Sequence, residues 1–303
     1  MTSNRNCVII YTQRKIGVIF IGSGAWSSMN YTNRIVNKGF TSADALFNAS
    51  TQSVFVRNSI KDTLNPYKVV RECCDSDEHP NTVPIILGLD VTGSMNHASK
   101  ACIAKLNDTI LSLYENFKDV EIAVAGIGDF NYDRSPFQLS QFESDTRIVD
   151  NLFDLYIENG GGGNAFESYS ALWYAGLHHT NLDCWKRGKK GILISLGDET
   201  LNPYLPKSAI NQVFGDTVQA DIDTEELYKE AVEKFDIYHI AITDKSCYER
   251  YASGIKNSFG PLLGQRLIIA TSEELPEIIN NIVKDSMSSV SSSVLISEDG
   301  ISW

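Results

Sequence analysis

The sequence has no apolar run that approaches the roughly 20 residues of a membrane-spanning helix, which excludes a helical membrane protein. Basic residues are scarce as well, with 26 Lys and Arg against 38 Asp and Glu. The resulting net charge of −12 repels phosphate backbones and anionic lipid, so nucleic acid is not an expected partner. Cysteine is also sparse, and 6 scattered cysteines in 303 residues do not form a disulfide framework. We therefore expect a cytoplasmic protein in a reducing compartment.

The first segment, residues 1–27, is open to three interpretations. Two basic residues followed by the apolar run 16–21 imitate a signal peptide, but no Ala-x-Ala cleavage pattern follows. The β-rich runs 7–11 and 16–21, with a polar stretch between them, fit a hairpin equally well. The third alternative is that translation begins at Met29, since the sequence after it has a different, polar character.

The domain organisation follows from a change of pattern near residue 83. Hydrophobic residues make up 43% of the chain and charged residues 21%, which is typical of a globular protein with a sizeable core. Residues 1–82 have a weak and mostly polar pattern and predict an N-terminal arm or leader that is partly flexible. Residues 83–285 predict one α/β domain, and residues 286–303 a Ser-rich tail.

Short apolar runs alternate with longer amphipathic stretches from residue 83 onward, which is typical of repeated βα units. Right-handed crossovers would place the helices on both faces of one sheet. The expected strands are 84–89, 121–127, 191–196, 237–242 and 266–269. The expected helices are 102–117, 145–157, 170–178, 225–235 and 273–283. The predicted fold class is therefore α/β, with a doubly wound, Rossmann-like and mostly parallel sheet and helices on both faces.

The most informative motif is Asp-Val-Thr-Gly-Ser at residues 90–94, directly after an apolar run and before a helical pattern. Asp90, Thr92 and Ser94 offer a carboxylate and two hydroxyls at a spacing that a turn into a helix can wrap around one ion. Oxygen ligands suit Mg²⁺, with Mn²⁺ or Ca²⁺ as alternatives, and the absence of His and Cys from the motif argues against Zn²⁺.

Acidic residues also follow other apolar runs, at Asp129, Asp198 and Asp244. Open α/β sheets bind ligands beyond the carboxyl ends of their strands, which predicts Asp198 near Asp90, with Asp129 a further candidate. Asp129, Asp133 and Asp244 are nevertheless interpreted as solvated loop acids or turn residues and not as ligands.

Two elements of this pattern resemble the von Willebrand factor type A (VWA) family, in its microbial and phage form. The metal-ion-dependent adhesion site (MIDAS) of that family carries Asp-x-Ser-x-Ser, a Thr from a second loop and an Asp from a third. Asp90, Thr92 and Ser94 match the first element, with Thr in place of the first Ser. Asp198 matches the third element.

The second element departs from the family pattern. The glycine run 160–163 leads to Asn164 and Glu167, where the family usually supplies Thr. The resemblance thus implies a metal site made of Asp90, Thr92, Ser94, Asn164, Glu167 and Asp198. Glu167 would add negative charge, which strengthens metal binding and weakens the attraction for an acidic partner.

The resemblance implies a VWA-type fold, with a doubly wound sheet that has one antiparallel edge strand, and a bound Mg²⁺. Thr92 and Ser94 would coordinate the ion directly, and Asp90 and Asp198 would act through water or directly. An open coordination position would accept a carboxylate from a partner protein, so the chain would be a metal-ion-dependent recognition module and not an enzyme. Family analogy adds an AAA+ ATPase as a partner.

Three other interpretations of the motif remain. Asp, Thr and Ser are also the residues that cap helix N-termini, so residues 90–94 fit an ordinary cap. A metal-dependent phosphohydrolase of the haloacid-dehalogenase type also has an Asp after a buried strand. That family requires a second Asp where Thr92 stands and an acid where Asn202 stands, so its general acid would be missing. The third alternative is a structural scaffold with a vestigial metal site.

Overall fold

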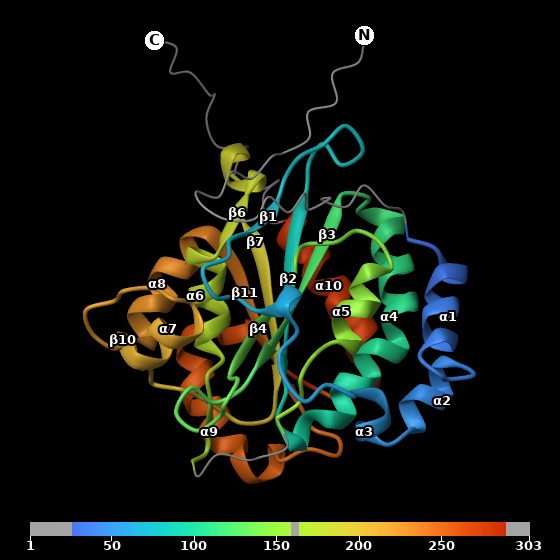
Figure 1. Ribbon diagram of the computed structural model, residues 1–303. Coiled ribbons are helices and arrows are strands. Elements are labelled where there is room, and N and C mark those ends of the chain that lie inside the picture. The colour runs from blue at the N-terminus through green and yellow to red at the C-terminus, as the bar shows by residue number, and fades with distance from the viewer. Residues whose placement is uncertain (1–25, 159–163, 289–303) are drawn as a thin grey trace, which may run out of the picture.

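The computed structural model describes residues 26–158 and 164–288 (Figure 1). The alternatives for the first segment, the glycine run 160–163 and the last part of the Ser-rich tail therefore fall outside the described residues. The division of the chain at residues 82 and 285 stays a prediction.

The main element is a six-stranded sheet with the order β12-β11-β7-β2-β3-β4. The first five strands in this order are parallel to one another, and β4 runs antiparallel to β3. The strands are β2 (Val83–Asp90), β3 (Val120–Ile127), β4 (Phe137–Leu139), β7 (Gly191–Gly197), β11 (Phe235–Ile242) and β12 (Leu267–Ala270).

The predicted fold class, a doubly wound Rossmann-like sheet of VWA type, is wrong. The sheet is mixed because the loop 128–136 returns the chain directly beside β3, and a short loop without a crossover helix produces an antiparallel pair. The described residues also form three separate two-stranded sheets. These pair β1 (Arg71–Cys73) with β6 (Thr180–Leu182), β5 (Phe166–Glu167) with β8 (Thr200–Leu201), and β9 (Tyr204–Leu205) with β10 (Ile222–Asp223).

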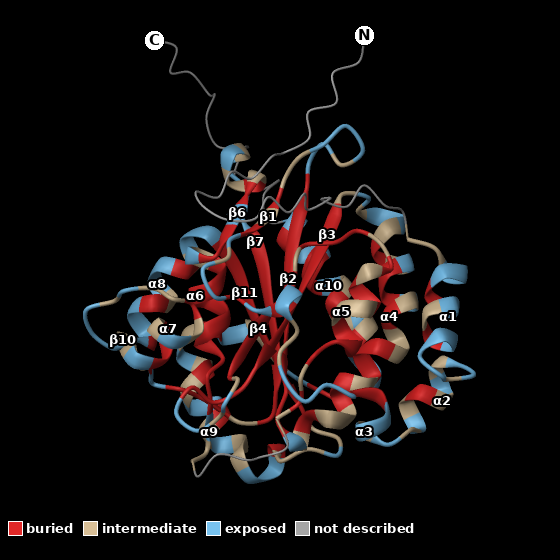
Figure 2. Cartoon of the chain, in the orientation of Figure 1, coloured by how far each residue is buried: buried red, intermediate tan, exposed pale blue. Residues whose placement is uncertain are grey.

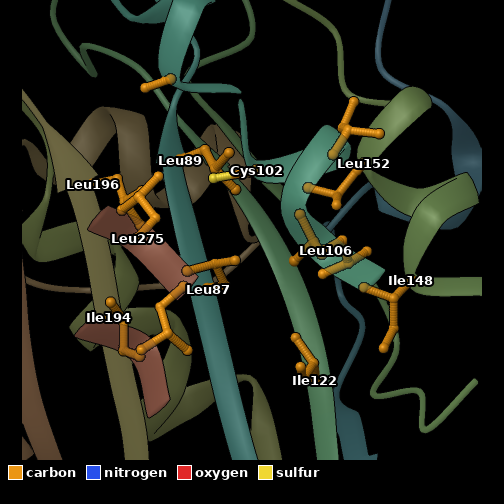
Figure 3. Packing of buried hydrophobic residues seen from close by; sticks show 14 of the residues in the cluster. Leu87, Leu89, Cys102, Leu106, Ile122, Ile148, Leu152, Ile194, Leu196 and Leu275 are labelled. Atoms are coloured by element: carbon orange, nitrogen blue, oxygen red, sulfur yellow. The ribbon is translucent and has the colours of Figure 1, made fainter. Parts of the chain in front are cut away.

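The central strands are buried along their whole length because helices cover both faces of the sheet (Figure 2). Side chains alternate between the faces. Leu87 and Ile194 belong to one hydrophobic cluster, whereas their neighbours Ile86 and Leu193 belong to the other. Figure 3 shows the first cluster, in which Leu87 and Ile194 lie with Leu106 of the long helix after the motif.

Each face has its own group of helices (Figure 1). One group consists of α4 (Asn96–Asn116), α5 (Arg147–Phe153) and α10 (Leu275–Ser288). The other consists of α6 (Ser170–His178), α7 (Lys207–Val213), α8 (Thr224–Lys234) and α9 (Tyr248–Leu263). Short 3₁₀ turns are η1 (Asp62–Leu64), η2 (Gly93–Met95), η3 (Asp183–Arg187), η4 (Gly264–Arg266) and η5 (Ser272–Glu274). No helix in the described ranges is both long and apolar enough to cross a bilayer.

The described part of the expected arm forms helices that pack on the outside of α4. These helices are α1 (Ser28–Asn37), α2 (Ala43–Asn48) and α3 (Thr51–Val54). Ile35, Leu46 and Val54 are buried in the same hydrophobic cluster as the inner strands. Asp154, at the end of α5, forms ion pairs with Arg57 and Lys61 and so ties the following segment to this face.

Candidate metal-binding site

The candidate site lies where β2 and β7 end, at the lower edge of the sheet in Figure 1. The two strands are parallel neighbours in which Leu89 pairs with Leu196, so the loops that follow them emerge side by side. Asp90 is the last residue of β2. It lies four residues after Ile86 and therefore faces the side of the sheet that α6 covers.

Asp90 is fully buried and accepts three hydrogen bonds. Its Oδ1 accepts from the backbone N–H of Thr92 at 2.9 Å and from the Thr92 hydroxyl. Its Oδ2 accepts from the hydroxyl of Tyr169 at 2.8 Å. Tyr169 is also fully buried and comes directly before α6, so the second loop does contribute to the site, through a residue that the sequence did not indicate.

Ser94 connects the first loop to the third. Its hydroxyl donates to Asp198 Oδ1 at 3.1 Å, and Asp198 Oδ2 accepts from the backbone N–H of Cys247 at 2.5 Å. Neither Thr92 nor Ser94 caps a helix, because η2 and α4 both begin without a side-chain cap hydrogen bond. The hydroxyls of the motif are directed at carboxylates, which an ordinary helix cap does not explain.

Glu167 and Asn164 occupy different places relative to this pair of loops. Asn164 donates to Asp129 Oδ2 at 2.8 Å, and no hydrogen bond joins it to Asp90 or Asp198 in the described residues. Glu167 is only 3% exposed, and its Oε2 has no hydrogen-bond partner in the described chain. Asp90 is the charged group with the largest influence on the pKa of Glu167.

The carboxyls of the site repel one another and are poorly solvated. Burial, and then the charge of Asp198, raises the pKa of Asp90 to about 8. Burial also raises the pKa of Asp198, and burial with the charge of Asp198 raises the pKa of Glu199 to about 7. Among the ion pairs of the described residues, none reaches Asp90, Asp198 or Glu167. A buried group of acids without a cationic side chain is stabilised by protons or by a bound cation.

The neighbouring acids Asp129, Asp133 and Asp244 were predicted to be solvated loop acids or turn residues. Asp129 is only 1% exposed and accepts hydrogen bonds from Asn131 and Asn164, so of its two interpretations, solvated acid or turn residue, the second is the one that the structure supports. Asp133 accepts from the backbone N–H of Asp129. Asp244 belongs to another network, in which it accepts from the backbone and hydroxyl of Ser272.

The donor atoms at these strand ends are oxygens, which is the type of ligand that a hard cation takes. In the described part of the chain, no three His, Cys, Asp or Glu side chains converge into a ready metal-binding group. Two hydroxyl–carboxylate pairs lie at this edge of the sheet, Thr92 with Asp90 and Ser94 with Asp198. The orphaned Glu167 Oε2 is a buried acceptor that a cation or its hydration shell would satisfy.

Two residues of the site were missed by the sequence analysis. Cys247 follows β11, the neighbour of β7, so the rule on carboxyl ends of strands predicts its position once the strand order is known. Only a weak indication of Tyr169 was present in the sequence, through the glycine at position 197. A Cβ built at Gly197 would lie 2.0 Å from the Tyr169 hydroxyl oxygen, so only glycine lets the tyrosine cross the end of β7 to reach Asp90.

Replacing Gly197 with alanine is expected to destabilise the protein by about 1–3 kcal/mol and to weaken cation binding. Tyr169 cannot move aside easily, because its ring packs against His239 and Phe259 at centroid distances of 4.8 and 5.6 Å. Urea unfolding measures the stability change. Gly93→Ala is the matched control on the same rim, since a Cβ there meets nothing within 4 Å. Equal losses in the two variants would contradict this account of Tyr169.

Comparison with known proteins gives only distant likenesses. No family model and no curated protein sequence matches the chain. The pilus adhesin SpaC from Lactobacillus rhamnosus GG, in its open conformation, is similar in structure with a TM-score of 0.46 and 13% identity over 69% of this chain. Proximal thread matrix protein 1 from the mussel byssus has a TM-score of 0.44 and 13% identity over 67%. The chain spans 30% and 47% of the lengths of these two proteins. The resemblance to the VWA family rests on the motif and stays a prediction.

Proposed function

We propose that the chain is a metal-ion-dependent recognition module, which binds an acidic group of a partner protein through Mg²⁺. The observation that carries this proposal is the contact between the Ser94 hydroxyl and Asp198 Oδ1, at 3.1 Å. It joins the first and third elements of the MIDAS-like motif across two strands. A capping role for the motif would leave this contact without a reason.

In this proposal Thr92 and Ser94 coordinate the ion directly, and Asp90 and Asp198 act through water or directly. Mn²⁺ or Ca²⁺ are alternative ions, because both also take oxygen ligands. The ion supplies a positive charge that attracts a carboxylate. Tyr169 and Thr92 hold Asp90 in one orientation, so this carboxylate needs no rearrangement when the cation arrives.

A partner protein would reach the site from the solvent-exposed side of the motif. Gly93 is exposed and Ser94 is partly exposed, whereas Asp90 and Asp198 are buried beneath them. A ligand therefore approaches over Gly93 and meets the ion before it meets the acids. An acidic side chain of a partner protein suits this position, and an AAA+ ATPase as that partner follows only from family analogy. A cytoplasmic location is part of the same proposal and agrees with the five described cysteines, all of which are free thiols.

The phosphohydrolase alternative has less support. Thr92 stands where that mechanism needs its acid and donates to Asp90. Asn202 donates to Ser170 at 2.6 Å and to the carbonyl of Tyr204 at 2.9 Å, so its amide is engaged in joining loops. The hydroxyl of Ser168 is buried and accepts from the backbone of Phe130, which leaves it poorly placed as a nucleophile. We therefore propose a binding protein and not an enzyme.

The experiment that tests this function uses Mn²⁺ bound to the full chain and measures the relaxation of water protons. Bound Mn²⁺ with an open position is expected to enhance relaxation, and N-acetyl-glutamate amide is expected to reduce the enhancement by displacing water. The glutamine analogue is the matched control and should have no effect. An aryl phosphate incubated with the Mn²⁺ protein should not be hydrolysed. Equal effects of the two analogues, or turnover of the phosphate, would argue against the proposal.

A further inference from the structure

A groove of about 350 Å³ lies between the helices of the expected arm and α4, on the side of α4 where α1 and α2 pack (Figure 1). Its lining includes Tyr31 of α1, Asp44 and Phe47 of α2, and Asn107 and Asp108 of α4. Tyr31 is held in place because its hydroxyl is directed at the carbonyls of Ala104, at 2.8 Å, and Ile103, at 3.0 Å. The groove is as large as a small ligand pocket and has room for side chains of another segment.

The groove carries an excess of negative charge. Its charged lining residues are Asp44, Asp108, Glu273 and Lys105. Lys105 pairs with Glu273, whereas neither Asp44 nor Asp108 forms an ion pair with any residue in the ranges 26–158 and 164–288. Burial, followed by the charges of Asp108 and Asp44, raises the pKa of Tyr31, so both carboxylates act on the same hydroxyl. Two carboxylates without a cation, beside aromatic rings, form a surface that suits basic side chains.

The described part of the chain begins at the edge of this groove. Trp26 is the first described residue, and its indole N–H donates to Asn107 Oδ1 at 3.1 Å. Its ring also lies near that of Tyr31, with a centroid distance of 6.0 Å. Asn107 and Tyr31 both line the groove. The segment that precedes Trp26 is therefore tethered directly beside the unpaired carboxylates.

The preceding segment has the charge that the groove lacks. Residues 1–25 contain Arg5, Arg14 and Lys15 and no Asp or Glu, in a chain whose net charge is −12. Arg14 and Lys15 are adjacent, so two cations can meet two carboxylates. Lys15 precedes Trp26 by 11 residues, a length that spans at most roughly 36–40 Å, so the basic pair can reach a groove that begins beside Trp26. A tether of this length also holds the pair at a roughly millimolar effective concentration.

We propose that this groove binds the basic pair Arg14 and Lys15 of the chain's own N-terminal segment. The two side chains pair with Asp44 and Asp108, and their apolar stems pack against Phe47. Exposed ion pairs contribute little by themselves, so the tether and the aromatic surface are needed for the contact to persist. The inference does not depend on the cation site proposed above, since none of these residues belongs to that site.

Crosslinking of the full chain with a water-soluble carbodiimide tests this contact. The reagent activates a carboxylate, the lysine amine attacks it and loses a proton to the solvent, and the reagent leaves as a urea, so an amide forms only where the two groups touch. Mass spectrometry should find Lys15 joined to Asp44 or Asp108. The pair of Lys105 and Glu273 is the internal standard and should crosslink in every sample. A mixture of ¹⁵N-labelled and unlabelled chains distinguishes links within one chain from links between two copies.

Tryptic cleavage is the second measurement, because docking shields the peptide bonds after Arg14 and Lys15. A double variant that carries Asp44→Asn and Asp108→Asn should be cleaved there about three- to tenfold faster, since cleavage follows the undocked population. The same variant should lose the crosslinks of Lys15 to the groove. Cleavage after Arg5 in the same digest is the internal control and should change less than about twofold.

The matched control is Glu115→Gln, which neutralises another exposed acid of α4 that does not line the groove. It should crosslink and be cleaved as the unmodified chain is. Unchanged cleavage in the double variant, or Lys15 joined only to acids outside the groove, would overturn the inference. Links from Lys15 to Asp44 or Asp108 that form only between differently labelled chains would overturn it too and identify a second copy as the occupant. Equal acceleration in Glu115→Gln would reduce the contact to a general attraction for an acidic surface and so reject it.

Discussion

Asp198→Ala is expected to lower the affinity for Mg²⁺ by at least about 100-fold, and Asp90→Ala by a similar factor. Within residues 26–158 and 164–288, Asp198 is the only carboxylate to which the Ser94 hydroxyl donates, so its removal detaches the first loop from the third. Two of the negative charges that attract the cation come from these residues. Calorimetric titration of Mg²⁺ into metal-free protein gives the affinities directly.

The control for this result is Asp244→Asn, which changes another acid after a neighbouring strand. Asp244 binds the backbone and hydroxyl of Ser272 and pairs with His97, so it belongs to a network apart from Ser94. Its variant should bind Mg²⁺ as the unmodified chain does. Asp198→Ala with unchanged Mg²⁺ affinity, in a folded protein, would mean that the motif is not a metal site. A comparable loss of Mg²⁺ affinity in Asp244→Asn would show instead that any acid at this edge of the sheet attracts the cation.

Much of the sheet could be predicted because its strands are apolar along their whole length. The run 84–89 became β2 and the run 237–242 lies within β11, since helices on both faces demand continuous hydrophobic residues. The mixed character of the sheet could not be predicted in this way. β4 is only three residues long, and the polar loop before it gives no periodic signal.

The helices of the expected arm were missed because the weak and mostly polar pattern of residues 1–82 was interpreted as a sign of flexibility. Ser27, Ser42 and Ser50 are in fact N-caps whose hydroxyls accept from backbone N–H groups at the starts of α1, α2 and α3. Helices this short are stable only when packed, and α4 supplies the surface that the local sequence cannot reveal.

The candidate site was predictable in its first and third loops and not in the second. The positions of Asp90 and Asp198 could be predicted because parallel neighbouring strands place their carboxyl ends together. Tyr169 and Cys247 depend on side-chain directions across different strands, which sequence spacing does not encode. Asn164 illustrates the same limit, since it lies close to Glu167 in sequence and binds Asp129 instead of the motif.

Glu167→Gln is expected to stabilise the metal-free protein and to weaken Mg²⁺ binding about tenfold. Burial, followed by the charge of Asp90, raises the pKa of Glu167 to about 12 from an unfolded value near 4.5. The folded protein therefore holds a proton that the unfolded chain releases, and wild-type stability falls as pH rises between these two values. At pH 7 the cost has an upper limit of about 3 kcal/mol, which glutamine avoids.

The measurement is thermal unfolding of both proteins at pH 5 and pH 8, each with a chelator and with Mg²⁺. In the chelator, the melting temperature of the variant should exceed that of the wild type slightly at pH 5 and by several degrees at pH 8, since 1 kcal/mol corresponds to about 2–4 °C. With added Mg²⁺ the wild type should have the higher melting temperature, because the cation binds the ionised carboxylate and offsets the cost of burying its charge.

A matched control separates a metal ligand from any poorly partnered buried acid. Glu121 is also 3% exposed with an orphaned Oε2, and burial raises its pKa to about 7, yet it lies at the start of β3 and not at the site. Glu121→Gln should likewise gain stability at pH 8 and keep its Mg²⁺ affinity. If Glu167→Gln also gained stability at pH 8 and kept its Mg²⁺ affinity, the Glu167 carboxyl would be a poorly partnered buried acid without a role in metal binding. Opposite effects on stability and on Mg²⁺ affinity, in Glu167→Gln alone, would identify it as a charge retained for the cation.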